Sequence, residues 1–162
     1  MTMKRLEGAG PFAVLVLLLG CRQPQETGYV PGLGELMSAQ QMRHAKLWFA
    51  GENRNWRLAS YEVDELREGF ADVVKLHPML ENSHIPVSQL VPTIIGGPLN
   101  AVGAAVQAQD QPRFEGAYDK LTTACNSCHQ AANFGFNVVK RPTEPPFSNQ
   151  EFQVTGGPRP PL

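Results

Sequence analysis

The sequence has no excess of either charge, because 14 Lys and Arg side chains oppose 15 Asp and Glu side chains in 162 residues. This balance removes the electrostatic attraction on which nucleic-acid binding depends. Catalytic patterns are missing too: there is no Ser-His-Asp arrangement, no phosphate-binding loop and no carboxylate pair spaced for acid–base work. The composition therefore favours a single domain that is not an enzyme and has no nucleic-acid partner.

Near its start the chain has an apolar run, Phe12–Leu19, that is too short to cross a bilayer as a helix. A short basic region precedes it, which is typical of a signal peptide. The run leads into LLGC at residues 18–21, which resembles the lipobox of bacterial lipoproteins. This resemblance implies that residues 1–20 are removed and that Cys21 is lipidated and held on a membrane by its acyl chains.

An ordinary cleaved secretory signal and an uncleaved anchor are the alternatives to lipidation. With lipidation we expect a bacterial periplasmic protein attached to a membrane. Arg22, directly after the lipobox, favours the outer membrane by resemblance to known sorting signals. Residues 21–32 contain Pro and Gly without periodicity, so we interpret them as a tether.

Cysteine is scarce, with three in the chain, and two of them lie in one short motif. Cys125, Cys128 and His129 form a C-x-x-C-H run. Two thiols at this spacing can add to the two vinyl groups of a haem, and the adjacent imidazole can bind the iron from one face. If Cys21 carries lipid and the other two cysteines bind haem, no free thiol remains. A free thiol would be open to oxidation in the periplasm. The motif therefore predicts one covalently bound haem c.

Three other kinds of site could use the same motif, and each fits this sequence less well. A zinc site needs four ligands, and the remaining histidines, at 44, 77 and 84, are distant and unpaired in sequence. A thioredoxin-like redox pair belongs after a strand, whereas this pair lies late in an expected helix. A disulfide across C-x-x-C inside a helix is geometrically awkward.

Helix-forming residues and apolar periodicity predict four helices, which cover residues 34–51, 54–77, 87–109 and 112–133. Gly51 and Gly135 are expected to end the first and the fourth. The third should be bent or split, because Pro92 and Gly96-Gly97-Pro98 lie inside it.

These helices form a predicted haem-binding domain at residues 33–136, followed by a proline-rich tail at 137–162. Phe147 and Phe152 are the tail side chains expected to pack on the bundle. Trp48 and Trp56 are expected in its core.

The fourth helix carries one continuous interior stripe, with side chains at intervals of 4, 3, 4 and 3: Phe114, Tyr118, Leu121, Cys125 and Cys128. His129 follows Cys125 by four residues and lies on nearly the same face. In the second helix we expect Tyr61, Leu66 and Phe70 in the apolar stripe and the acids, including Glu62, on the solvent side.

A C-x-x-C-H motif near the end of the last of four helices resembles the class II c-type cytochromes, the cytochrome c′ group and its low-spin relatives. The resemblance covers roughly residues 33–136. It implies an antiparallel four-helix bundle with haem between the helices near one end, with Cys125 and Cys128 as thioether residues and His129 as proximal iron ligand. The lipobox and the long tail depart from the usual pattern of the family.

The sixth iron ligand is predicted from topology. In an up-down-up-down bundle the end of the fourth helix lies beside the start of the first, the end of the second and the start of the third. Met37, early in the first helix, is the predicted ligand, and low-spin class II cytochromes draw a methionine from the same helix. His44, His77 and Met79 are alternatives, as is an open iron site with Met37 in the core. A class I arrangement is excluded, because no methionine follows Met79.

Two axial ligands would leave the iron little room for substrate, which suits the transfer of single electrons. The expectation is a membrane-tethered periplasmic electron carrier whose partners are periplasmic or membrane redox proteins. An open iron would instead bind NO or CO, and a third interpretation is a non-catalytic subunit of a membrane complex. A homodimer is a further possible state.

Overall fold

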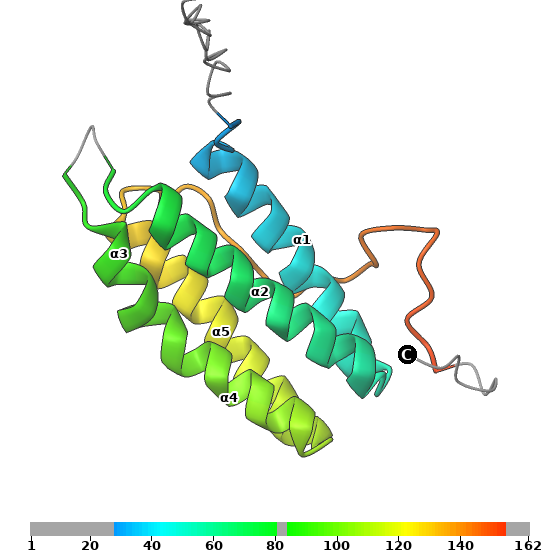
Figure 1. The fold of residues 1–162 in the computed structure, drawn as a ribbon. Coiled ribbons are helices and arrows are strands. Elements are labelled where there is room, and N and C mark those ends of the chain that lie inside the picture. Colours follow the sequence, from blue (N-terminus) through cyan, green and yellow to red (C-terminus); the bar gives the residue numbers. More distant parts are fainter. Residues whose placement is uncertain (1–27, 81–83, 155–162) are drawn as a thin grey trace, which may run out of the picture.

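The computed structural model describes residues 28–80 and 84–154, which form an all-α protein of four antiparallel helices (Figure 1). Three of these helices are α1 (Leu33–Glu52), α2 (Trp56–Leu76) and α5 (Gln111–Ala131). The remaining one consists of three consecutive segments: α3 (Val87–Leu90), the π-helical η1 (Val91–Ile95) and α4 (Gly96–Gln107). The predicted all-α class and antiparallel four-helix arrangement are confirmed. The predicted signal peptide and Cys21 lie outside the described residues.

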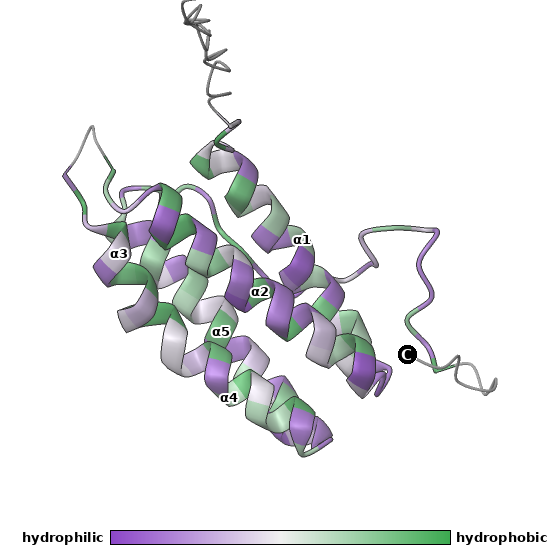
Figure 2. Cartoon of the chain, viewed as in Figure 1, coloured by the Kyte–Doolittle hydropathy of each residue, from purple (hydrophilic) through white to green (hydrophobic). Residues whose placement is uncertain are grey.

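The third helix is interrupted where the sequence predicts a bend. Pro92 lies in η1 and has no backbone N–H to donate to an α-helical hydrogen bond, and a π-helical turn is one way to absorb that loss. By length and composition, Val87–Gln107 is the one stretch of the described residues that could cross a membrane, and 39% of its apolar window is buried in the bundle. Figure 2 shows few hydrophilic residues on α4, in contrast to the visible sides of α1 and α2.

Two of the predicted helix ends are wrong. Gly51 does not end α1 but lies buried in its last turn, where a Cβ atom would overlap the ring of Phe114. Glycine is required there for close packing, and α1 ends at Glu52. At the end of α5 it is Asn133, with φ of 63°, that adopts the left-handed conformation expected of Gly135.

An aromatic cluster fills the core at the end of the bundle where α1 meets α2. The rings of Trp48 and Phe114 stack with centroids 6.1 Å apart, and Tyr118 approaches Trp48 at 5.1 Å. Trp56 meets Phe114 edge-on at 6.0 Å and is half-buried, whereas Trp48 is buried. The stripe predicted on α5 is confirmed, because Phe114, Tyr118 and Leu121 are fully buried.

The buried face of α2 agrees with the prediction at Leu66, which is 2% exposed, and differs from it at two other positions. Tyr61 is 56% exposed, and Glu62 is 2% exposed instead of facing solvent. Burial raises the pKa of the Glu62 carboxyl, with Lys46 acting in the opposite direction. Gly69 faces α1, because a Cβ atom there would overlap the side chains of Gln40 and Arg43. The α1 residue Gln40 donates from its amide to the backbone oxygen of Leu66 at 2.8 Å.

The segment Asn137–Phe152, here called the strap, leaves the end of α5 and runs back along the bundle (orange to red in Figure 1). Arg141 forms two hydrogen bonds to Asp119 of α5, at 2.7 and 3.1 Å, and its guanidinium lies 4.0 Å from the ring centroid of Trp48 on α1. Phe152 is buried against Phe49, as predicted. Phe147 remains 41% exposed, with Lys46 over its ring.

Candidate functional site

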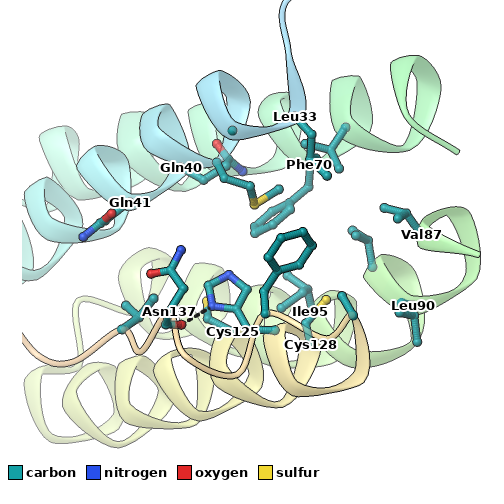
Figure 3. A pocket seen from close by; sticks show the side chains of 18 of the residues that line it. Leu33, Gln40, Gln41, Phe70, Val87, Leu90, Ile95, Cys125, Cys128 and Asn137 are labelled. Carbon is teal, nitrogen blue, oxygen red and sulfur yellow. Dashed lines mark hydrogen bonds between the residues drawn. The ribbon is translucent and has the colours of Figure 1, made fainter. Parts of the chain in front are cut away.

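A cavity of about 280 Å³ opens at the end of the bundle where α1 and α3 begin and α2 and α5 end. Its volume is close to the lower end of the roughly 300–1,000 Å³ of small-molecule sites. The four helix ends that topology predicts to be neighbours do meet around it, and side chains from each converge in Figure 3. Much of its wall is apolar, contributed by Phe70, Val73, Val87, Leu90, Val91 and Ile95.

Cys125 and Cys128 lie in the last two turns of α5, and both line the cavity with free thiols (Figure 3). Burial is the main cause that raises the pKa of the Cys125 thiol, to about 12, and the nearby Cys128 adds to it. Burial likewise raises the pKa of Cys128. A redox-active or nucleophilic cysteine needs a lowered pKa, so these thiols are poorly suited to thioredoxin-like chemistry.

His129 lines the same cavity and is oriented by the backbone beyond α5. Its ring Nδ1 lies 2.6 Å from the carbonyl oxygen of Asn137, the interaction dashed in Figure 3. A carbonyl can only accept, so Nδ1 carries the proton in this bond and Nε2 is the nitrogen with a free lone pair. This tautomer is the one that suits a metal-binding histidine.

The candidate sixth ligands occupy different positions. Met37 is half-buried and lines the cavity from α1. His77 does not line it, and its Nε2 lies 2.8 Å from the backbone oxygen of Pro31. Met79 is 47% exposed and also lies outside the lining. The structure thus brings Met37, and not His77 or Met79, to the cavity that contains His129.

His44 also lines the cavity, but both of its ring nitrogens have partners. Nδ1 lies 2.9 Å from the Tyr118 hydroxyl, and Nε2 lies 2.9 Å from the Thr122 hydroxyl. Burial lowers the pKa of His44 to about 4, so the ring is neutral at pH 7. Burial also raises the pKa of Tyr118, which keeps its phenol protonated. The three side chains form a hydrogen-bonded group at the edge of the cavity. His44 could bind a metal only after one of these hydrogen bonds breaks.

The part of the chain that the structure describes forms no protein-only metal site around the motif. Within residues 28–80 and 84–154, no group of three or more His, Cys, Asp or Glu side chains is placed to hold a metal ion. The described residues therefore do not bring together the four protein ligands that the zinc interpretation requires. A haem supplies the equatorial ligands itself and needs one or two from the chain, which the motif and Met37 can provide.

Some residues at the site were not singled out from the sequence. Gln40 and Gln41 add polar side chains to the α1 wall, and Asn137 and Val139 bring the strap to the cavity. Asn126, the first residue between the two cysteines, bonds to Val139. The only signal for Asn126 in the sequence was its place inside the motif, because the strap has no periodicity that would predict its path.

Comparisons with protein-family models, with curated proteins and with solved structures gave no match for this chain.

Proposed function

We propose that this protein is a mono-haem c-type cytochrome that carries single electrons, tethered to a bacterial membrane by lipid on Cys21 and facing the periplasm. One observation carries the proposal: both thiols and the imidazole of a single C-x-x-C-H motif line one apolar cavity between four helix ends. The resemblance of the motif and the bundle to class II c-type cytochromes points to the same function. We assign no enzymatic reaction to it.

The donor set of the cavity fits a covalently bound haem. Cys125 and Cys128 would supply the two thioether links, and Nε2 of His129 the proximal ligand. When bound, haem c supplies one-electron exchange at its iron. The apolar side chains around the cavity would limit the access of water to a bound haem, and the Asn137 carbonyl holds the imidazole in one tautomer.

Met37 favours the electron carrier over the gas-binding alternative. It approaches the cavity from α1, whereas His129 approaches it from α5. The Met37 thioether would supply a second iron ligand from the chain and leave little room for a gas molecule. His44 is a poorer donor for the same position because its ring nitrogens are engaged by Tyr118 and Thr122.

The mouth of the cavity offers a surface on which a redox partner could dock. Phe134 lines the cavity and is 39% exposed, and its ring lies 6.0 Å from that of Phe136, which is 83% exposed. Exposed aromatic side chains are enriched in protein interfaces. We therefore propose periplasmic or membrane redox proteins as partners, approaching at this edge.

The proposal is tested by producing the full chain in a bacterial host that matures c-type cytochromes. We expect coloured protein, a mass increase of one haem, and sharp low-spin bands in the reduced absorption spectrum. The C125A/C128A double variant should lose the covalent haem, whereas C21A should retain it and leave the membrane fraction. Colourless wild-type protein would contradict the proposal, and rapid carbon monoxide binding by the wild type would support the gas-binding alternative.

A further inference from the structure

We propose that Asn126 is a positioning residue: it clamps the strap so that the carbonyl of Asn137 holds His129 and thereby tunes the reduction potential of the iron. This inference rests on the proposed function. Asn126 lies inside the C-x-x-C-H motif, and its side chain bonds to the strap.

The clamp consists of two hydrogen bonds to one residue. Asn126 Nδ2 donates to the backbone oxygen of Val139 at 2.9 Å, and the backbone N–H of Val139 donates to Asn126 Oδ1 at 2.8 Å. One side-chain amide thus satisfies both backbone groups of a strap residue, as a neighbouring strand would. A side chain that lacks either the donor or the acceptor cannot form this pair.

The clamped residue is two positions from the one that holds His129. Asn137 accepts from His129 Nδ1 at 2.6 Å, and its own backbone N–H donates to the oxygen of Phe134 at 2.8 Å. Phe134 in turn donates its N–H to the backbone oxygen of His129 at 2.6 Å. The Asn137 carbonyl is therefore fixed from the preceding side by the turn after α5 and from the following side by Asn126.

Asn126 and His129 also lie on neighbouring positions of the same helix, three residues apart. One turn of α5 therefore carries both the proposed ligand and the side chain that anchors the acceptor for that ligand. The hydrogen bonds between Asn126 and Val139 therefore oppose any movement of the strap away from α5. Such a movement would lengthen the hydrogen bond between His129 and Asn137.

A histidine that donates Nδ1–H to a firm acceptor is a more basic ligand, which favours the oxidised over the reduced iron. When the acceptor is released, the balance shifts toward the reduced form and the midpoint potential rises. If release of the acceptor weakens the binding of oxidised iron tenfold relative to reduced iron, the midpoint potential rises by about 59 mV.

The test compares N126A with two control variants in the haem-loaded full chain. S127A changes the other residue inside the motif, whose hydroxyl bonds only within α5, to the oxygen of Thr123. R141A removes a strap anchor further along, the ion pair with Asp119, and leaves the Asn126 clamp in place. We expect N126A to raise the potential by about 59 mV and both controls to leave it unchanged.

Two further measurements separate positioning from a merely structural role. Hydrogen exchange at the Val139 amide should accelerate in N126A, and the NMR signal of the His129 Nδ1 proton should weaken or shift. A faster exchange with unchanged potential and ring signal would overturn the inference, as would an R141A effect as large as that of N126A. If N126A does not load haem, the NMR signal of the His129 Nδ1 proton is compared between the haem-free N126A and wild-type full chains. An identical signal in the two proteins would overturn the inference. Wild-type protein without haem would refute the proposed function instead.

Discussion

The Tyr118 hydroxyl lies 2.9 Å from Nδ1 of His44, and the two rings stack with their centroids 4.4 Å apart. The hydroxyl donates its one proton to the backbone oxygen of His44 at 2.9 Å, so toward Nδ1 it acts as the acceptor. This pairing fixes a histidine at the cavity wall as a structural residue. It explains how a titratable side chain can lie 3% exposed beside a candidate haem site without serving as its ligand.

Substitution of Met37 tests the sixth ligand. In M37A we expect the low-spin spectrum to become high-spin and carbon monoxide to bind rapidly, because the thioether on the α1 wall is removed. M42A is the matched control, since Met42 is half-buried on the same helix but does not line the cavity. Reduced spectra of the three proteins provide the measurement, and an unchanged M37A spectrum would mean that another residue, or none, is bound.

The burial of His44 predicts a loss of stability in acid. The unfolded chain binds a proton at His44 below about pH 6.5, but the folded protein does so only below about pH 4. The contribution of neutral His44 to the free energy of unfolding is therefore fully present above pH 6.5. It declines by about 3 kcal/mol as the pH falls to about 4.

Urea unfolding at pH 7, 5.5 and 4 measures this decline. H44Q should show a smaller dependence on pH, whereas H84Q should behave like the wild type because His84 is exposed. An equally steep dependence in H44Q would assign the effect to other groups.

The contact of Gly51 with Phe114 predicts opposite effects of two glycine substitutions. G51A should destabilise the fold by about 1–3 kcal/mol, because its new methyl group overlaps a buried aromatic ring. G116A should stabilise it by about 0.5–1 kcal/mol, since a Cβ at this exposed position in α5 meets no atom within 4 Å. Thermal unfolding of both variants provides the comparison, and a G51A protein as stable as G116A would show that the Phe114 ring can move aside.

The strap should contribute to stability through Phe152. F152A is expected to cost about 3 kcal/mol, because this ring is 5% exposed and packs against Phe49 at a centroid distance of 5.6 Å. F147A should change the free energy of unfolding little, since Phe147 is 41% exposed. Chemical denaturation measures both, and equal effects of the two variants would contradict the packing described for the strap.

Much of the fold could be predicted because its signals are local. The interior stripe of α5 follows from a repeat of about 3.6 residues, and the break in the third helix follows from Pro92. The buried face of α2 could not be predicted in the same way. Gly69 leaves room for Gln40 and Arg43 of α1, and Glu62 lies buried on the same helix despite its charge.

The residues of the candidate site also differ in how far the sequence could predict them. Cys125, Cys128 and His129 were predicted from their spacing alone, and topology brought Met37 to the same end of the bundle. The partners of His44 could not be predicted, because Tyr118 and Thr122 are 74 and 78 residues away from it in sequence.

By itself, the amino-acid sequence determined the helices and the spacing of the motif on one of them, because both depend on residues within a few positions of one another. The tertiary structure alone decided which side chains became neighbours across the bundle. Only packing makes Gly51 a contact of Phe114, His44 a hydrogen-bonded wall residue and Asn126 the partner of the strap. Such contacts depend on distances between elements that no local pattern encodes.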